Sequence, residues 1–262
     1  LDGYTKEKFM NDKKVRVLLA GESWISYGVH IKGFASYTTA TYEEGLAPLA
    51  RALEGFAELV YVPNHKADED FPDTAEELAS AFDVVLFSDI AADTLLLHPD
   101  TLLRSIIRPN RLRGVQEFVA QGGGFSMIGG YMSFAGIEGK ANYRHTPIAE
   151  ILPVVIESGD DRIEIPEGFR PQIVDASHPI LQGIPDDWPV LLGYNRFSAK
   201  RDGRILVRHG DDPFLVAGTY GKGRTLAYAS DCSPHWGSPE FVDWEHYTTF
   251  WRQLVNWLAS QI

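Results

Sequence analysis

Residues 122–134 read Gly122-Gly123-Gly124-Phe125-Ser126-Met127-Ile128-Gly129-Gly130-Tyr131-Met132-Ser133-Phe134, an apolar run set between glycines. The preceding residues, Arg111–Gln121, place apolar side chains at helical spacing and stop at three glycines, where a left-handed cap is easily reached. We therefore predict a helix over 111–121, a short buried strand, and a tight turn at Gly129 and Gly130, where another group can approach the bare backbone. In a doubly wound sheet, ligands bind at such strand ends.

Other apolar runs predict the remaining strands and helices. Before the central run they lie at Lys14–Ala20, Glu58–Val62 and Asp83–Asp89, and after it at Arg204–Arg208, Phe214–Thr219 and Arg224–Ala229. Two helical patterns alternate with the early strands. The first is opened by a capping box of Thr41 and Glu44 and bent at Pro48, and the second is capped by Asp73 or Thr74. A terminal helix runs from about Glu240 to Leu258. Alternating strands and helices predict an α/β fold with a doubly wound, mostly parallel sheet flanked by helices.

Three segments do not fit this alternation. Residues 22–41 are long, aromatic and glycine-containing, and we predict a functional loop or lid there. Asn64–Phe71 is polar and acidic, which indicates a loop. Prolines punctuate short alternating runs between Leu152 and Phe197, which predicts a β-rich insertion at about residues 152–200 within a single domain spanning 1–262.

Composition restricts the class of partner. The formal net charge is -12, so nucleic acid and anionic membrane surfaces would repel the chain at long range. No run of about 18 apolar residues occurs, and Leu1–Lys13 has no apolar core of the kind that a secretory signal needs. The single cysteine, Cys232, excludes an intramolecular disulfide and fits a reducing compartment. We expect a cytoplasmic protein that binds neither nucleic acid nor membrane.

The glycine-rich helix end, the strand and the turn at Gly129 resemble the nucleophile elbow of the class I glutamine amidotransferase-like superfamily, a flavodoxin-like fold. The resemblance is to its glutamine amidotransferase-like and trehalose-utilisation (ThuA-like) members, and it extends from Lys14–Ala20 to the last helix near Trp257. Active members place a cysteine where this chain has Gly129. Without a side chain there, the covalent thioester route of a glutaminase is not available.

The residues beyond the predicted strand ends are the candidates for chemistry. The resemblance implies an acidic residue after the first strand, matched by Glu22, and a histidine late in the chain, for which His235 is the candidate. We expect these two as catalytic acid–base groups, with the Gly129 and Gly130 amides polarising a substrate oxygen. The other expected ligand-binding residues are Trp24, Tyr131, Tyr143, His145, Asp231 and Trp236, which supply flat faces and polar groups.

Two further chemistries stay open. Cys232 lies three residues before His235 and is a candidate thiol nucleophile, although a lone cysteine at a buried strand end is more often inert. Asp231, His235, His246 and Glu22 include ligand types for a divalent cation, but their spacing matches no compact motif. We expect neither a bound metal nor a cofactor.

The sequence supports three functions. The first is a glutamine amidotransferase-like protein that has lost glutaminase activity. The second is an acid–base isomerase or hydrolase that acts on a small polar molecule such as a sugar derivative, which the ThuA-like resemblance connects with carbohydrate metabolism. The third is a non-catalytic binding or assembly module, a homo-oligomer whose Arg104–Arg113 cluster and aromatic loops form subunit contacts.

Overall fold

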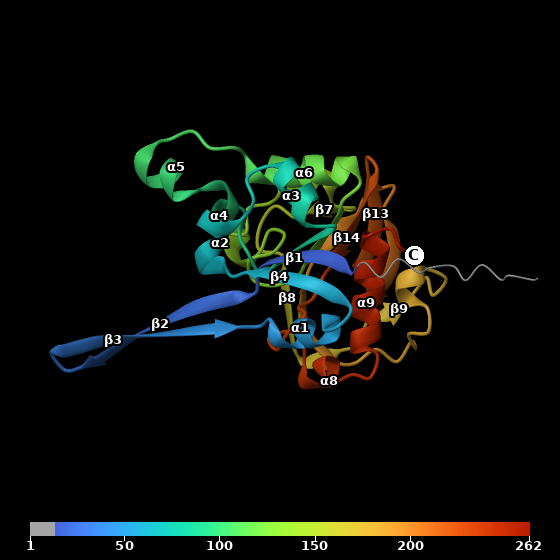
Figure 1. The fold of residues 1–262 in the computed structure, drawn as a ribbon. Helices are drawn as coiled ribbons and strands as arrows, with labels where there is room; N and C mark the ends of the chain where they lie inside the picture. The colour runs from blue at the N-terminus through green and yellow to red at the C-terminus, as the bar shows by residue number, and fades with distance from the viewer. Residues whose placement is uncertain (1–13) are drawn as a thin grey trace, which may run out of the picture.

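The structure, a computed structural model, describes residues 14–262, which build a central sheet of eight strands (Figure 1). The strand order is β4 (Ala57–Val62), β1 (Val15–Gly21), β5 (Val84–Ser88), β6 (Gly124–Ile128), β14 (Gly223–Tyr228), β13 (Asp212–Tyr220), β12 (Arg204–His209), β9 (Gln172–Ile173). Strands from β4 to β14 are parallel, and those from β13 onward are antiparallel. The parallel part has the flavodoxin-like order 2-1-3-4-5 in chain order, which confirms the predicted α/β class.

Helices cover the two faces of this sheet in separate groups (Figure 1). On one face α1 (Ala47–Leu53) packs against α9 (Tyr247–Leu258), with the short α8 (Pro239–Val242) nearby. The other face carries α2 (Asn64–Asp70), α3 (Ala75–Ala81), α4 (Ala92–Leu96), α6 (Arg111–Gln121) and α7 (Pro147–Ile151). The prediction of α6 is confirmed residue for residue. The Thr74 hydroxyl caps α3 by accepting the Glu77 amide, as the sequence predicts.

The predicted loop or lid over residues 22–41 is instead a long β-hairpin. Strands β2 (Ser23–Lys32) and β3 (Ala35–Glu44) pair antiparallel and project far from the body as an arm, defined here as residues 23–44 (Figure 1). Thr41 and Glu44 belong to β3, so the predicted capping box is wrong. The physical reason is the alternation of β-branched and aromatic residues along both strands, joined by a turn at Gly33 with φ +60°.

Three other predictions need correction. Asn64–Asp70 forms helix α2 rather than a loop, and its last carbonyls are satisfied by the buried Arg111 guanidinium, which donates to Ala67 and Asp68. The terminal helix is broken at residues 243–246 into α8 and α9. Pro48 lies in the first turn of α1, where its missing N–H has no helical partner to lose, and it bends nothing.

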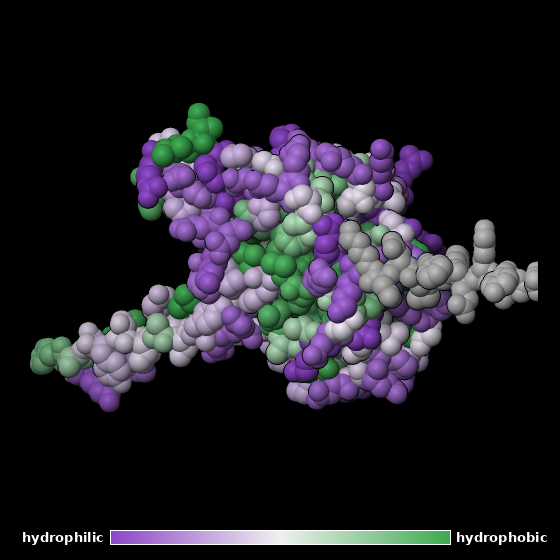
Figure 2. Space-filling view, viewed as in Figure 1, coloured by the Kyte–Doolittle hydropathy of each residue, from purple (hydrophilic) through white to green (hydrophobic). Residues whose placement is uncertain are grey.

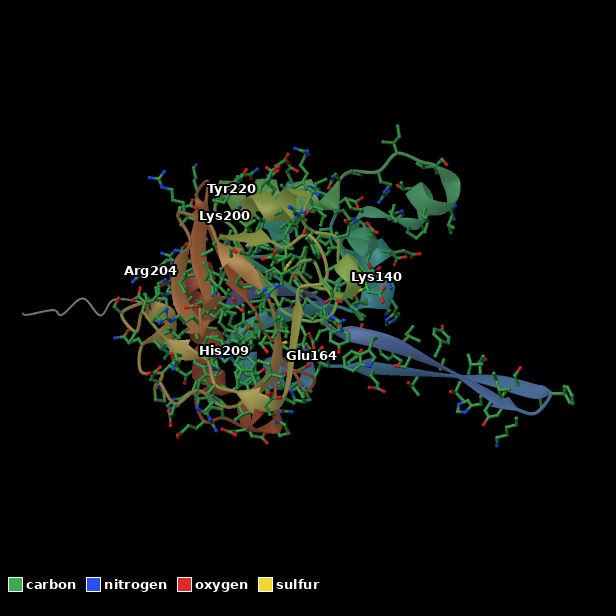
Figure 3. The ribbon with its side chains drawn as sticks, turned by 180° about the vertical axis from the view of Figure 1, so that it is seen from behind. Lys140, Glu164, Lys200, Arg204, His209 and Tyr220 are labelled. Atoms are coloured by element: carbon green, nitrogen blue, oxygen red, sulfur yellow. The ribbon has the colours of Figure 1, made fainter. Side chains whose placement is uncertain are left out.

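The predicted β-rich segment forms two small antiparallel sheets beside the central one. Strand β8 (Arg162–Phe169) pairs with β10 (Leu191–Asn195), and β7 (Val154–Ile156) pairs with β11 (Phe197–Ala199). Figure 3 shows this half of the molecule from behind, with Glu164 on β8 and with Arg204 and His209 on β12. Strand β10 reaches the carboxyl end of β14, where the Asn195 amide donates to the Ala229 carbonyl, and β11 packs against β13.

Among residues 14–262, no helix is both long and apolar enough to cross a membrane. The expectation that Leu1–Lys13 is not a secretory signal concerns residues outside the described part of the chain.

Arg111 connects α2, α3 and α6, and its removal should destabilise this face. Its side chain is 2% exposed, and Nε donates to Asp73 Oδ1 at 2.7 Å. We expect Arg111→Ala to cost about 3–5 kcal/mol of unfolding free energy, because Asp73 loses a partner and the α2 carbonyls lose their donor. Urea denaturation measures this loss. Arg113→Ala, an exposed position on the same helix, is the matched control, and equal midpoints for both variants would contradict the prediction.

Candidate functional site

A cleft of about 530 Å³ opens at the carboxyl edge of the parallel strands. Its walls come from four segments: the root of the arm, the residue after β5, the loop after β6 and the loop after β14. The lining residues are Trp24, Ile25, Ser26, Asp89, Tyr131, Met132, Ile137, Asp231, Pro234 and His235. Strands β1 and β5 flank the topological switch point of the sheet, so the cleft occupies the position where α/β proteins of this type bind ligands.

The elbow glycines leave no room for a nucleophile. A Cβ built at Gly129 would lie 2.1 Å from the carbonyl oxygen of Ala229, and one at Gly130, where φ is +153°, would lie 2.8 Å from Asp89 Oδ1. The contact at Gly129 is with backbone and far inside the distance that a real Cβ tolerates, whereas at Gly130 the Asp89 side chain would have to shift. The close approach of β6 to β14 therefore excludes a side chain at Gly129 in this backbone.

The amides of the elbow are also already engaged. The Gly129 N–H donates to the Tyr228 carbonyl at 2.8 Å, and the Gly130 N–H donates to Asn195 Oδ1 at 2.9 Å. Neither is available to a ligand oxygen, so the expectation that these two amides polarise a substrate is wrong. A side chain from β10 holds Gly130 in place instead.

Asp161 is a buried bracing residue that the sequence analysis missed. Its carboxylate accepts the Ala135 and Gly136 amides at 2.9 Å each and the Asn195 side-chain amide at 2.8 Å. Through these bonds Asp161 and Asn195 fix the loop after β6 that carries Tyr131. Asp161 lies in the proline-rich segment without a recognisable local motif, and only its 1% exposure identifies it.

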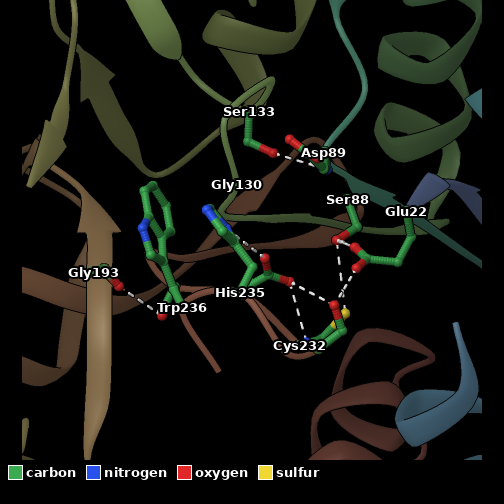
Figure 4. Close-up of polar contacts among 12 residues, drawn as sticks. Glu22, Ser88, Asp89, Gly130, Ser133, Gly193, Cys232, His235 and Trp236 are labelled. Carbon is green, nitrogen blue, oxygen red and sulfur yellow. Dashed lines mark hydrogen bonds and ion pairs between the residues drawn. The ribbon is translucent and has the colours of Figure 1, made fainter. Parts of the chain in front are cut away.

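Glu22 lies beneath the cleft rather than on its wall. It is 1% exposed, and its carboxylate accepts hydrogen bonds from the Ser88 and Ser233 hydroxyls. The Ser233 Oγ to Glu22 Oε1 distance is 2.5 Å, and the Ser233 amide donates to Asp231 Oδ1 at 3.1 Å (Figure 4). Ser233 thus bridges Glu22 to Asp231, which does line the cleft. Glu22 has φ 50°, an unfavourable backbone conformation of the kind that concentrates at functional sites.

The carboxyl groups of Glu22, Asp89 and Asp231 lie close together, and the negative charge of one disfavours ionisation of its neighbours. Burial, reinforced by the charge of Asp231, raises the pKa of Glu22 to about 7. Burial and the nearby Asp89 raise the pKa of Asp231 to about 8, and burial and Glu22 raise the pKa of Asp89 to about 6. Near neutral pH the group therefore holds one or more protons that it can exchange.

His235 is the group best placed to exchange a proton with a ligand. Its Nδ1 lies 3.3 Å from Asp231 Oδ2, and its ring lies against Trp236 (Figure 4). The His235 ring also meets the Tyr131 ring edge to face. Burial lowers the pKa of His235, which favours the neutral imidazole that can accept a proton. Among the hydrogen bonds of residues 14–262, none engages Nε2.

The structure separates the other predicted ligand-binding residues into two groups. Trp24 and Tyr131 line the cleft as expected. Trp236 is buried behind His235, with Nε1 donating to Glu164 Oε2 at 3.0 Å, and the Tyr143 hydroxyl donates to the Ile90 carbonyl in the core. His145 lines a different surface groove beside Lys200. Trp236, Tyr143 and His145 therefore do not line the cleft, because sequence proximity to the elbow does not fix where a side chain points.

Cys232 is sealed in the same buried cluster. Its thiol is 3.7 Å from Ser88 Oγ, and burial together with the charges of Glu22 and Asp231 raises its pKa well above the ordinary value. A neutral, buried thiol is a poor nucleophile. One potential ligand atom each from Glu22, Asp231 and Cys232 lies within 4.8 Å of the others, so a cation could be held only by displacing their protons. His246 stands apart at the start of α9, against Trp244.

Adding a methyl group at the elbow should separate β6 from β14. We expect Gly129→Ala to lower the unfolding free energy by about 3 kcal/mol, the upper end of the usual range for overpacking, because its Cβ would overlap the Ala229 carbonyl. Gly159→Ala is the matched control, since nothing lies within 4 Å of its new Cβ. Chemical denaturation compares the two variants, and equal stability would show that the backbone around Gly129 can shift to accommodate a methyl group.

The buried Glu22 should make stability depend on pH. Since its pKa rises from about 4.5 in the unfolded chain to about 7 in the folded one, the folded state binds more protons between these values, and stability falls as pH rises through them. We expect Glu22→Gln, which cannot ionise, to remove part of that fall and to gain about 1–3 kcal/mol relative to wild type between pH 5 and pH 8.

Denaturation midpoints at these two pH values measure the effect. Glu117→Gln on the exposed face of α6 is the control and should follow the wild-type profile. Parallel profiles for wild type and Glu22→Gln would contradict the assignment of a raised pKa to Glu22.

Comparison with known proteins agrees with this architecture. Two solved structures are similar along nearly their whole length. The cytoplasmic protein STM3548 from Salmonella typhimurium is 43% identical, with a TM-score of 0.89, and the match covers 92% of this chain and 98% of the other. The cytoplasmic protein STM1381 from Salmonella typhimurium LT2 is 45% identical, with a TM-score of 0.89, and the match covers 93% of this chain and 99% of the other.

A β-galactosidase from Rahnella sp. R3 shares only the fold, at 16% identity, TM-score 0.50, and coverage of 82% of this chain and 26% of the other. No curated protein sequence gives a significant match. The family model described as "Putative glutamine amidotransferase" (GATase1-like) matches residues 16–260, which is nearly all of the described chain. This chain belongs to that glutamine amidotransferase-like family.

Proposed function

We propose that this protein is not a glutaminase but an acid–base enzyme that transfers protons on a small, neutral, polyhydroxylated molecule. The observation that carries the proposal is the His235–Asp231 pair, with 3.3 Å between Nδ1 and Oδ2, at the wall of a cleft of about 530 Å³. Cavities of about 300–1,000 Å³ are typical of small-molecule sites.

The lack of a nucleophile argues against acyl transfer. A glutaminase of this superfamily needs a thiolate at the elbow, and a side chain at Gly129 or Gly130 would overlap neighbouring atoms. Cys232 does not replace it, because the thiol is buried and its pKa is raised. The family membership therefore supplies the fold, and the chemistry follows from the groups that the cleft contains.

The proposed mechanism uses His235 as the exchanging group. When the proton of the buried carboxyl pair lies on Glu22, ionised Asp231 accepts the Nδ1–H of neutral His235 and fixes the ring orientation. Nε2 of His235 then takes a proton from a ligand hydroxyl or from a carbon next to a carbonyl, and Asp231 stabilises the imidazolium. Ser233 connects Asp231 to Glu22, so the buried carboxyl pair can redistribute a proton as His235 changes charge. Glu22 acts through this pair and does not contact the ligand.

The lining of the cleft favours a neutral polyol or sugar derivative. Trp24 and Tyr131 offer aromatic faces, and Asp89 and Asp231 offer acceptors for hydroxyl groups. Two acidic side chains in the wall disfavour anionic ligands, and the net charge of -12 disfavours nucleic acid and anionic membranes. The two similar Salmonella proteins carry the label cytoplasmic, which supports a cytoplasmic location for this chain.

The test combines ligand binding with hydrogen exchange. Aldoses, ketoses, polyols and sugar acids are screened by thermal shift, and those that stabilise the protein are incubated in D₂O and followed by proton NMR. We expect neutral members to bind and to exchange a proton in the presence of wild-type protein. His235→Gln should retain the thermal shift and slow exchange by about 10²–10⁴-fold, the range for loss of a general acid–base group.

His145→Ala is the matched control, a histidine outside the cleft, and should exchange at the wild-type rate. Ammonia release from glutamine should be absent. If glutamine were hydrolysed and Cys232→Ser abolished the reaction, the proposal would fail, and it would fail equally if His235→Gln exchanged at the wild-type rate. Binding of a polyol without exchange in any variant would indicate the non-catalytic binding module instead.

A further inference from the structure

The arm exposes one continuous apolar face. Because side chains alternate along a strand, every second residue of β2 points to the same side, and on that side the register places β3 residues 36, 38, 40 and 42 opposite them. The large apolar residues of this face and of the arm tip are Ile25, Tyr27, Val29, Ile31, Phe34 and Tyr42, which are 45–113% exposed. The opposite side carries mainly polar residues such as Ser26, Thr39 and Thr41.

Within residues 14–262 this face is covered only at its root, where Tyr42 meets the His65 ring and Ile25 lines the cleft. Only the root of the arm packs on the body, against α2, and from there the two strands extend into solvent (Figures 1 and 2). Ten residues at about 3.3 Å each make a ribbon roughly 33 Å long. A two-stranded ribbon without a third layer is marginally stable in water. The arm therefore lacks the packing that would normally hold such a ribbon.

A second apolar surface lies at the same end of the molecule. Helix α5 (Pro99–Arg104) and the residues that follow it project from the body and expose Leu102, Leu103, Ile106 and Ile107, which are 49–95% exposed. We name this surface the α5 knob. Figure 2 shows apolar atoms at the tip of the arm and on the knob, on the same side of the body and separated by an open gap.

The size of these surfaces matches a subunit interface. With about 150–250 Å² for a large side chain, the arm face exposes on the order of 700 Å², more than the roughly 300–600 Å² of the largest patch on a typical monomer. Together with the α5 knob it exceeds the area of about 800 Å² per partner that a standard interface buries.

The charges favour a second copy of this chain as the partner. Residues 24–42 contain no acidic residue in a chain of formal net charge -12, so two arms can approach a second body without like-charge repulsion. The arginines of residues 101–113 are largely balanced within the chain, because Arg104 and Arg108 pair with Asp100 and Asp73 and Arg111 is buried against Asp73. Neither the arm face nor the α5 knob therefore carries an excess of acid that would oppose their contact in a twofold dimer.

We propose that the arm is a dimerisation element whose apolar face docks on the α5 knob of a second copy of this chain. In a dimer with twofold symmetry, the arm of each copy contacts the α5 knob of the other copy. Because the root of the arm, from Trp24 to Ser26, forms one wall of the cleft, the dimer also fixes that wall. The inference stands on exposure and charge and is independent of the proposed chemistry.

The test measures mass in solution with matched variants. The arm variant is Tyr27→Ser/Val29→Ser/Ile31→Ser, and the knob variant is Leu103→Ser/Ile107→Ser. The control changes the opposite face of the same arm, Ser26→Ala/Thr39→Ser/Thr41→Ser. By light scattering and analytical ultracentrifugation we expect wild type and control to be dimers at micromolar concentration, and both apolar variants to dissociate at least 100-fold more readily.

A mixing experiment tests the pairing of arm with knob. The arm variant retains an intact knob and the knob variant retains an intact arm, so mixing them restores one of the two contacts, and a heterodimer should form that neither variant forms as a homodimer. Circular dichroism melts confirm that each variant is folded. A monomeric wild type, an arm variant that stays dimeric, or a knob variant that stays dimeric would each overturn the proposal.

Discussion

The close contact between the end of β6 and the end of β14 is the constraint on which the rest of the site depends. Gly129 sits so near the Ala229 carbonyl that no side chain fits between them. This approach brings the loop that carries Tyr131 beside the loop that carries Asp231 and His235. The same contact that shapes the cleft leaves no space for a side chain at Gly129.

The buried carboxyl groups lower the stability of the folded state. Burial, and then the charge of a neighbouring carboxylate, raises the pKa values of Glu22, Asp89 and Asp231, and a folded state that must keep protons on buried acids loses stability as pH rises. A hydrophobic replacement would avoid that penalty. Glu22 and Asp89 also both have positive φ, directly after β1 and β5. Unfavourable backbone dihedral angles and buried carboxyl groups with raised pKa values therefore occur together at the switch point of the sheet.

Much of the fold was predictable because local rules and tertiary structure agree there. The apolar spacing and the three glycines fix α6 and β6, and the strand ends bring Asp231, His235 and Tyr131 to one cleft. The arm was missed because residues 22–41 contain no buried apolar run like those of the central strands, since both strands of the hairpin extend into solvent and pair only with each other across the turn at Gly33. Trp236, Tyr143 and His145 were misplaced because the direction of a side chain in an irregular loop depends on distant contacts. Asp161 was missed for the same reason, since its partners lie 25 to 34 residues away.

One asparagine joins the arm to the floor of the cleft. The Asn64 side-chain amide donates to the Ser23 carbonyl at 2.6 Å and to the Asp89 carbonyl at 2.9 Å, while its backbone amide donates to Ser23 Oγ. Asn64 at the start of α2 is therefore one anchor of the hairpin root, beside the ring contact of Tyr42 with His65 and the hydrogen bond from the Gly45 amide to the Glu22 carbonyl. Because one side chain holds both Ser23 and the Asp89 carbonyl, the position of the arm root and the position of a cleft-lining acid depend on the same residue.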